Sequence, residues 1–307
     1  MKNKVTIIMY HYVRPIKNSL NPNLKGLELD NFIKQLNFLK KNYTIISIER
    51  IFEYLYKKKK LPSKSCLLTF DDGYKDHIKY VLPELVKRKI KACFFPPAEA
   101  IQKNKMLDVN QIHLLLSKCK NYDEIIYDIK KILLKNNFSN IQFEKMYNKL
   151  AIQGRWDNKK IIFIKRVLQH GIEINLRKKI LKFLIKKNIA KKHIKNFYMN
   201  KSDIKKLISN GMFVGSHGYS HTWLGKQSFK DQKKEIIKSL RFLNELGVNT
   251  KNWIMCYPYG SYNKDTLKIL SQLNCYLAFT SQKGLASLEK SNLLKLKRFD
   301  TNDFPQN

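Results

Sequence analysis

The chain has 307 residues, 43% of them apolar and 12% aromatic, with 11 Gly and 8 Pro, a composition that supports a buried core and excludes disordered, collagen-like and low-complexity chains. The formal net charge is +36, but the excess is mostly Lys spread through the whole chain, and neither zinc-finger spacing nor a long basic tail accompanies it. We therefore interpret the charge first as a Lys-rich solvated surface, second as attraction to anionic lipid or glycan, and last as nucleic-acid binding.

The first apolar run, Val5–Met9, follows two lysines and ends before His11. A secretory signal needs a longer apolar region and a small-residue cleavage site, so this run predicts a buried first strand. No stretch approaches the roughly 18 apolar residues of a membrane span. The 5 Cys form no C-x-x-C pair, which is typical of a reducing compartment. We expect a cytoplasmic protein with the inner membrane face as a potential contact.

Further strand-like runs alternate with helical patterns along the chain. With the first run, the expected strands are Val5–Met9, Tyr43–Ile46, Cys66–Phe70, Ala92–Phe95, Met212–Gly215, Trp253–Cys256, Tyr276–Thr280 and Leu293–Leu296. The expected helices are 30–41, 48–55, 76–88, 202–210, 228–246 and 263–273. Strands that alternate with helices predict a parallel α/β sheet or barrel.

Residues 102–200 interrupt this rhythm, because they contain no convincing strand. Their basic amphipathic patterns predict helices over 108–119, 122–135, 141–150, 157–169 and 176–187. We expect a basic all-helical insertion at 102–200 in a barrel formed by 1–101 and 201–307. Insertions at strand ends are where such scaffolds carry specificity or partner contacts, and a separate helical domain with no role in the site is the alternative.

Two segments carry residues suited to a metal site. His217 and His221 lie four residues apart directly after a strand-like run, so both imidazoles can reach one ion. Asp71 and Asp72 end another run, where barrel enzymes build their active sites. One carboxylate can join the two histidines on a metal while the other acts as a general base. Each segment alone has an ordinary alternative, a chance His pair or an Asp-Gly turn.

Two more strand ends add to this constellation. Pro258 and Gly260 fix a rigid turn that can aim a backbone N–H at a reacting oxygen. His11 ends the first strand, although a histidine there is by itself more often a packed core residue. The C-terminal ends of barrel strands form one surface, so the four segments predict one common site.

These segments resemble motifs of the polysaccharide deacetylases, carbohydrate esterase family 4 with its NodB-homology domain. TFDDG at 69–73 is similar to the first motif of the family and PYG at 258–260 to the end of the third. HGYSH at 217–221, followed by Leu224, is similar to the second, with Gly218 in place of Ser or Thr. The resemblance covers about 1–100 and 200–300 and implies an α/β fold, a distorted (β/α)7 barrel of the NodB type.

The family also implies a divalent metal, for which we expect Zn, with Fe, Co or Ni also suited to the ligands. By position in the motifs, Asp72, His217 and His221 would bind it. Asp71 would be the general base, and the backbone N–H of Tyr259 would stabilise the oxyanion.

The sequence departs from the family pattern at two places. The Arg that usually stands two residues before the Pro of the third motif is replaced by Cys256, and we expect Arg298 to take its place beside the base. The late Leu-x-His motif is absent, since no His follows His221. Family members with a Y-H-x-[VI] segment look circularly permuted, and MYHYV at 9–13 matches it, so His11 is the expected acid that protonates the leaving amine.

The sequence thus predicts a metal-dependent amide hydrolase that removes an N-acetyl or similar acyl group from an amino sugar in surface polysaccharide or glycoconjugate biosynthesis. We expect a nucleotide- or lipid-linked saccharide as substrate and contact of the Lys-rich insertion with anionic membrane. A catalytically degenerate glycan-binding barrel, motivated by Cys256, and a deacetylase of another small amide are the alternatives. His77 is expected on a helix surface, with a place behind the metal ligands as the alternative. Trp223 and Tyr219 either stack on a sugar or pack.

Overall fold

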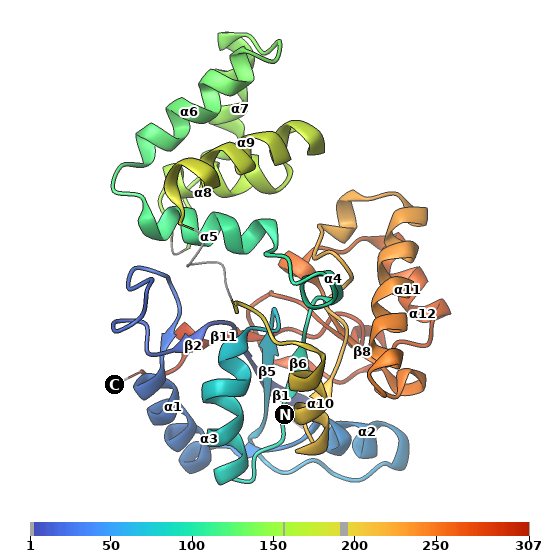
Figure 1. The fold of residues 1–307 in the computed structure, drawn as a ribbon. Coiled ribbons are helices and arrows are strands. Elements are labelled where there is room, and N and C mark those ends of the chain that lie inside the picture. The colour runs from blue at the N-terminus through green and yellow to red at the C-terminus, as the bar shows by residue number, and fades with distance from the viewer. Residues whose placement is uncertain (1–2, 156, 191–195, 307) are drawn as a thin grey trace. The chain divides into compact units, whose positions relative to one another are not determined.

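The structure is a computed structural model that describes residues 3–155, 157–190 and 196–306 (Figure 1). The chain divides into two compact units. The first comprises Met1–Pro15, Gly26–Lys105 and Asn196–Asn307, and the second comprises Ile16–Lys25 and Met106–Lys195. Residues 16–25, which the sequence-based division places with the barrel, therefore group with the helical unit.

A seven-stranded sheet forms the centre of the first unit. Its main path runs β10-β1-β5-β6-β7, with β11 beside β1 and β4 beside β5, and only the pairing of β1 with β10 is antiparallel among them. The strands are β1 (Lys4–Tyr10), β4 (Thr44–Ile45), β5 (Ser65–Asp71), β6 (Cys93–Phe95), β7 (Phe213–Val214), β10 (Ala286–Ser287) and β11 (Phe299–Asp300). Parallel strands covered on both faces read as continuous apolar runs, as the wholly buried β5 does.

Single bridges continue this sheet into a ring. β8 (Ile254–Cys256) pairs in parallel with β9 (Leu277–Phe279), and a bridge from Ser216 to Met255 joins β8 to the chain that follows β7. A bridge from Phe279 to Leu296 then leads to β11, which pairs with β1. The ring is thus a distorted barrel of mainly parallel strands, as predicted. The expected strand at 293–296 contributes only this one bridge. A separate short pair, β2 (Val13–Arg14) and β3 (Leu27–Glu28), lies outside the ring.

Helices follow the strands of the first unit, as the amphipathic patterns predict. They are α1 (Leu29–Asn42), α2 (Ile48–Lys57), α3 (Leu82–Lys87), α4 (Ala98–Gln102), α10 (Lys201–Ser209), α11 (Phe229–Glu245) and α12 (Lys264–Gln272). The expected helix over 76–88 begins instead with a π-helical turn, His77–Val81, and becomes α-helical at Leu82, next to a proline.

Side chains from alternate strand positions fill the barrel interior, because successive residues of a strand point to opposite faces. One buried cluster joins Val5, Ile7, Leu67, Cys93, Phe95, Ile254, Cys256, Leu277, Phe279 and Leu296. Continued in steps of two, these series end in polar side chains at the carboxyl ends of the strands. The continuations run from Ile7 to His11, from Leu67 to Asp71 and from Leu296 to Arg298.

The second unit contains helices only, among its described residues (Figure 1). They are α5 (Asp108–Lys118), α6 (Tyr122–Leu134), α7 (Asn140–Leu150), α8 (Lys159–Arg166) and α9 (Ile174–Asn188), around one apolar core of their own. Side-chain caps start several of them, such as Asn121 for α6 and the capping box of Ser139 and Gln142 for α7. No helix in the described part of the chain is both long and apolar enough for a membrane crossing.

His77 lies inside the first unit and not on a helix surface, which corrects the sequence-based expectation. Its side chain is buried, and its Nε2 donates to the backbone oxygen of His11 at 2.9 Å. The ring packs edge-on against Phe70 and Tyr74, and Nδ1 has no hydrogen-bond partner in the described part of the chain. Burial lowers the pKa of His77 to about 4, because a charged ring would have to be desolvated.

Protonation of His77 should therefore weaken the fold in mild acid. The unfolded chain binds this proton near pH 6.5 and the folded chain only near pH 4. The stability that the neutral ring contributes is therefore fully present above pH 6.5 and is lost as the pH falls from 6.5 to 4. The loss amounts to about 3 kcal/mol. His77→Gln, which keeps an N–H donor, should remove that part of the slope when unfolding by urea is measured between these pH values. The half-buried His113→Gln serves as control, and an unchanged slope in His77→Gln would contradict the assignment.

Candidate active site

Three buried side chains meet at the carboxyl ends of β5 and β7. Asp72 directly follows β5, and His217 and His221 belong to the loop after β7. Nε2 of His217 lies 3.3 Å from Asp72 Oδ1, and Nε2 of His221 lies 3.2 Å from the same oxygen. The sequence-predicted metal ligands are therefore brought together, one carboxylate oxygen facing two imidazole nitrogens.

The hydrogen bonds around this trio fit a bound cation. Nδ1 of His217 donates to the backbone oxygen of Cys256 at 2.8 Å, which leaves the lone pair of a neutral ring on Nε2. Asp72 Oδ1 is buried and has no hydrogen-bond partner among the described residues. Lone pairs that face one another in a buried site are balanced by a positive ion, and one carboxylate with two imidazoles is a donor set that divalent transition metals accept.

Asp72 is an anion in this environment. Burial alone would raise the pKa of Asp72, but the adjacent imidazoles of His217 and His221 outweigh it and hold the pKa well below its ordinary value. The second oxygen, Oδ2, accepts a hydrogen bond from the hydroxyl of Tyr74, a residue that the sequence motifs did not single out.

Asp71 forms a buried, two-pronged ion pair with Arg298. Nη1 of the guanidinium donates to Oδ1 at 3.0 Å and Nη2 donates to Oδ2 at 2.8 Å. The arginine is fixed in turn, because Nε donates to the backbone oxygen of Thr280 at 2.8 Å and Nη1 to the hydroxyl of Thr69 at 3.0 Å. Burial would raise the pKa of Asp71, but Arg298 outweighs it and lowers the pKa to about 2. Asp71 is thus an ionised, rigidly held base.

Cys256 fits between the two members of this pair. Its thiol donates to Asp71 Oδ2 at 3.3 Å and accepts from Arg298 Nη2 at 3.0 Å. Burial raises the pKa of the Cys256 thiol, so the group keeps its proton as a donor. Arg298 thus reaches Asp71 from the segment after the last strand-like run, and its replacement of the family arginine stays a prediction.

His11 lies across the site from the ligands. Its Nε2 is 3.9 Å from Asp71 Oδ2, and its side chain is 40% exposed. The position sets a partly open imidazole beside the buried Asp71 carboxylate. The structure thus brings His11 into the predicted constellation, although it follows the first strand of the chain.

The backbone of the site is strained at three places. Asp72, His221 and Tyr259 have φ values of 70°, 54° and 58°, in the left-handed region that disfavours L side chains. The other non-glycine residues with positive φ in the described chain are all Lys or Asn. Such conformations cost on the order of 1–3 kcal/mol each and gather at functional sites, where the surroundings enforce them.

Tyr259 places its ring edge-on against His221, with the ring centroids 4.7 Å apart. Trp223 stacks on the other side of this turn at 4.7 Å from the Tyr259 ring, and Lys226 lies 5.3 Å from the Trp223 ring. Trp223 therefore packs against site residues, and of the two expectations for it packing is the one observed. The role of the Tyr259 backbone N–H as an oxyanion donor stays a prediction.

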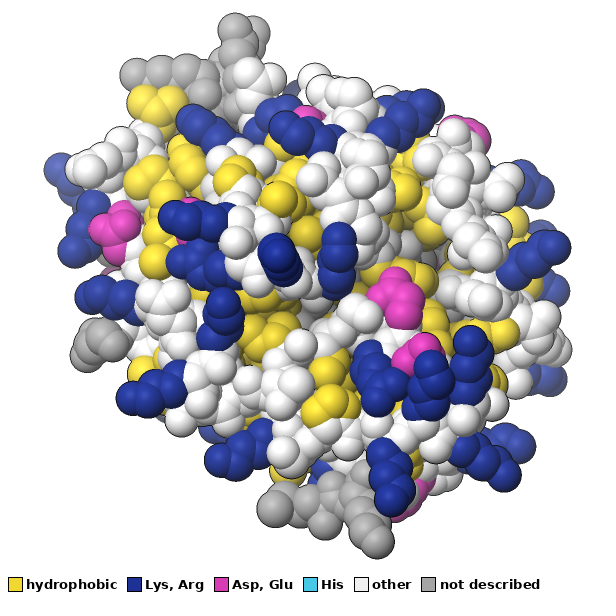
Figure 2. Space-filling model, turned by 90° about the horizontal axis from the view of Figure 1, so that it is seen from below, with side chains coloured by type: hydrophobic (Ala, Val, Ile, Leu, Met, Phe, Trp, Pro, Cys, Tyr) yellow, Lys and Arg dark blue, Asp and Glu magenta, His cyan; other side chains and the backbone are white. Residues whose placement is uncertain are grey.

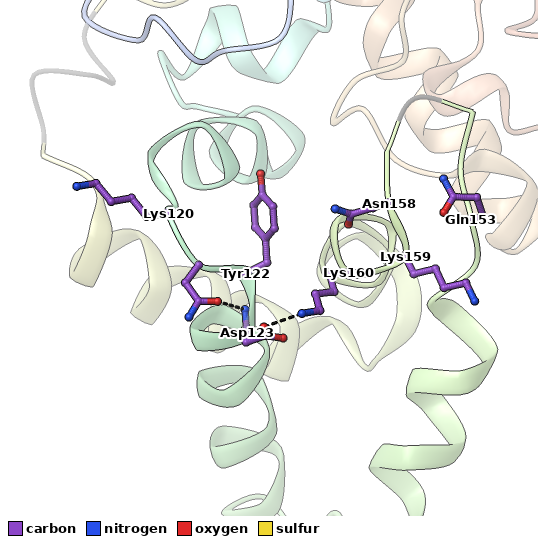
Figure 3. A pocket seen from close by; sticks show the side chains of 8 residues that line it. Lys120, Tyr122, Asp123, Gln153, Asn158, Lys159 and Lys160 are labelled. Carbon is purple, nitrogen blue, oxygen red and sulfur yellow. Dashed lines mark hydrogen bonds and ion pairs between the residues drawn. The ribbon is translucent and has the colours of Figure 1, made fainter.

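A pocket of about 460 Å³ in the helical unit has a different character (Figure 3). It is lined by lysines and amides near the starts of α6 and α8. Lys120 and Lys159 point away from one another, and Lys160 is paired with Asp123 at 2.6 Å (Figure 3). The side chains do not converge on one point, so this pocket offers no catalytic arrangement.

The chain is similar to several known proteins. The family described as polysaccharide deacetylase matches residues 58–127 and 175–278, which is more than half of the chain. YxkH of Bacillus subtilis, which is named as a polysaccharide deacetylase, is 26% identical over 108 residues. That match covers 35% of this chain and spans only 37% of the relative's length.

Solved structures share the fold over nearly the whole chain. The deacetylase PplD of Streptococcus pyogenes, solved in complex with acetate, has a TM-score of 0.60 at 20% identity and covers 98% of this chain and 93% of its own. IcaB of Ammonifex degensii has a TM-score of 0.59 at 18% identity, over 99% of this chain and 95% of its own. These structures confirm the NodB-type fold that the sequence predicts.

Removal of Arg298 should destabilise the protein strongly, because it leaves Asp71 as an uncompensated buried charge. We expect Arg298→Met to lower the free energy of unfolding by about 3–5 kcal/mol. Arg50→Met is the matched control, since Arg50 pairs with Glu53 at 2.7 Å on the surface, and it should lose less than about 1 kcal/mol. The double variant Asp71→Asn with Arg298→Met should lose less than the sum of the single changes in urea unfolding. Equal losses for the Arg298 and Arg50 variants would disprove the coupling.

Proposed function

The chain belongs to the polysaccharide deacetylase family, hydrolases that act on the amide bonds of N-acetylated sugars, and we propose that it is a metal-dependent N-deacetylase of an amino sugar. The observation that carries the proposal is the convergence of Asp72, His217 and His221 next to the Asp71–Arg298 pair. Ligands and base thus stand side by side at the carboxyl ends of the barrel strands, where such scaffolds carry out chemistry.

Asp72, His217 and His221 would hold a divalent ion, Zn in our proposal, which when bound supplies a Lewis acid for the acyl carbonyl and the attacking water. Asp71 takes the proton of that water, because Arg298 keeps the carboxylate ionised and fixed.

The remaining groups act on the other side of the amide. The N–H of Tyr259 donates to the oxyanion as the carbonyl becomes tetrahedral. His11 gives a proton to the departing amine as the C–N bond breaks, since an amine leaves poorly without one. The distance of 3.9 Å between His11 Nε2 and Asp71 Oδ2 supports this role, because both proton-transfer groups could then reach one small substrate group.

The substrate in our proposal is a nucleotide- or lipid-linked saccharide in surface polysaccharide or glycoconjugate biosynthesis. All 5 cysteines are free thiols, which suits a reducing compartment. The helical unit has 23 Lys+Arg against 7 Asp+Glu, and on α9 the exposed Phe183 stands among exposed lysines. We therefore propose that this unit binds an anionic membrane or the phosphate of a linked substrate.

Nucleic acid remains an unfavoured partner. Figure 2 shows Lys and Arg side chains scattered over the lower face of the molecule, with apolar and uncharged side chains between them. A scattered charge differs from the continuous basic stripe that follows a phosphate backbone. The picture supports a Lys-rich solvated surface for that face.

The decisive experiment is acetate release from N-acetylated sugars, including nucleotide- and lipid-linked forms, by metal-stripped and Zn-restored protein. Release should require the metal. Asp71→Asn should lower turnover by about 10²–10⁴-fold while one equivalent of Zn still binds, because the variant loses the base and not a ligand.

Asp203→Asn provides the matched control, as a buried aspartate at the start of α10 that pairs with Lys75. It should keep wild-type turnover. Full activity in Asp71→Asn would refute the assigned base. Bound Zn without release of any acyl group would point to another small amide, and saccharide binding without Zn or release would favour the degenerate glycan-binding barrel.

Membrane contact has its own test in sedimentation with lipid vesicles. We expect binding to phosphatidylcholine vesicles that contain phosphatidylserine and little binding to phosphatidylcholine alone. Reversal of three charges on α9, at Lys179, Lys182 and Lys186 to Glu, should weaken binding by about tenfold or more, because each charge near the surface is worth about 1 kcal/mol. The same reversal at Lys57, Lys58 and Lys60 in the first unit is the control, and an equal loss there would rule out the helical unit as the contact.

A further inference from the structure

The metal ligand Asp72 is oriented by a second residue, Tyr74. The phenol of Tyr74 donates to Asp72 Oδ2, while Oδ1 faces the imidazoles of His217 and His221. A carboxylate with both oxygens free can turn or bind an ion through either or both of them. The hydrogen bond removes this freedom, because it commits Oδ2 to the phenol and leaves Oδ1 for the ion.

Tyr74 is itself held in an aromatic cluster of the first unit. Its buried ring stacks on Tyr12 with centroids 4.1 Å apart and meets Phe197 edge-on at 5.6 Å. Two backbone hydrogen bonds also fix the position of Tyr74. Met199 N donates to the backbone oxygen of Gly73 at 2.9 Å, and Lys75 N donates to the backbone oxygen of Phe197 at 3.0 Å.

The residues of this cluster stand at two of the four points where the chain passes between the units, the first exit and the last return. Tyr12 and Arg14 precede Ile16, at which the chain enters the helical unit, and Phe197 lies just after the return at Asn196. Arg14 strengthens the junction, because its Nε donates to Asp76 Oδ2 at 2.6 Å and its guanidinium lies 5.3 Å from the Tyr12 ring. Segments at two of the four points where the chain passes between the units thus pack around Tyr74.

We propose that Tyr74 is a positioning residue that makes Asp72 a one-oxygen ligand, and that the segments before Ile16 and after Asn196 hold Tyr74 in place through Tyr12 and Phe197. The inference rests on the proposed metal site. It adds that metal affinity depends on a phenol outside the ligand set and on the aromatic cluster of the first unit that holds this phenol.

The test compares metal binding by the full-length protein and its Tyr74→Phe variant. Zn affinity is measured by competition with a chromophoric chelator, and the ligand field is read from the visible spectrum of the Co²⁺-loaded protein. Tyr74→Phe should weaken Zn binding by about 10–100-fold, as loss of a partner to a ligand does. It should also change the Co²⁺ spectrum, because Oδ2 becomes free to bind the ion.

Tyr10→Phe is the matched control. Tyr10 is equally buried on the neighbouring strand, but its hydroxyl has no hydrogen-bond partner among the described residues, so its removal should leave both readouts unchanged. Phe197→Leu loosens the cluster without touching Asp72 and should weaken Zn binding to a smaller degree. Its control is Phe52→Leu, a residue that packs against Phe213 and Tyr276 elsewhere in the unit.

The outcomes separate the inference from the proposed function. If the wild-type protein binds neither ion, the metal site and the inference both fail. If wild type binds and Tyr74→Phe matches it in affinity and spectrum, only the inference fails, and an equal effect of Tyr10→Phe overturns it as well. Thermal unfolding of the metal-free variants shows whether they are folded. If Tyr74→Phe is unfolded, the comparison of Phe197→Leu with Phe52→Leu decides. Equal Zn affinities of these two variants would overturn the inference.

Discussion

The buried ion pair of Asp71 and Arg298 is the interaction on which the rest of the site depends. A carboxylate at the top of a barrel interior, surrounded by apolar layers, would take up a proton and lose its use as a base without a fixed cation. The guanidinium supplies that charge from the residue just before β11, so the pair joins β5 to a segment far along the chain. The Cys256 thiol and the hydroxyl of Thr69 complete the surroundings of the pair.

The sequence predicted the barrel and the composition of the site because both follow from short patterns. Period-two series along the strands place Asp71 and Arg298 on the interior side, and motif spacing places His217 and His221 on one loop. The predicted insertion also emerged, since long amphipathic patterns with caps identify helices without any knowledge of tertiary contacts.

The features that the sequence did not reveal depend on contacts between distant segments. No sequence motif singles out Tyr74, because only the folded chain shows its phenol at Asp72. His77 was expected at a helix surface but is buried. The reason is that a π-helical turn shifts the side-chain directions that an α-helical period assumes. Residues 16–25 looked like part of the barrel, because their grouping with the helices of the second unit is set by contacts far along the chain.

The left-handed backbone at Asp72, His221 and Tyr259 has a consequence for how such a protein changes under selection. Gly or Asn relieves strain at these positions and would raise stability, so a search for heat-resistant variants would find them readily. Each such gain would remove a ligand or reshape the turn beside it. Lineages that retain the chemistry are therefore expected to gain thermal tolerance at other positions, and Gly or Asn at position 72 or 221 would mark a descendant that has kept the barrel and given up its reaction.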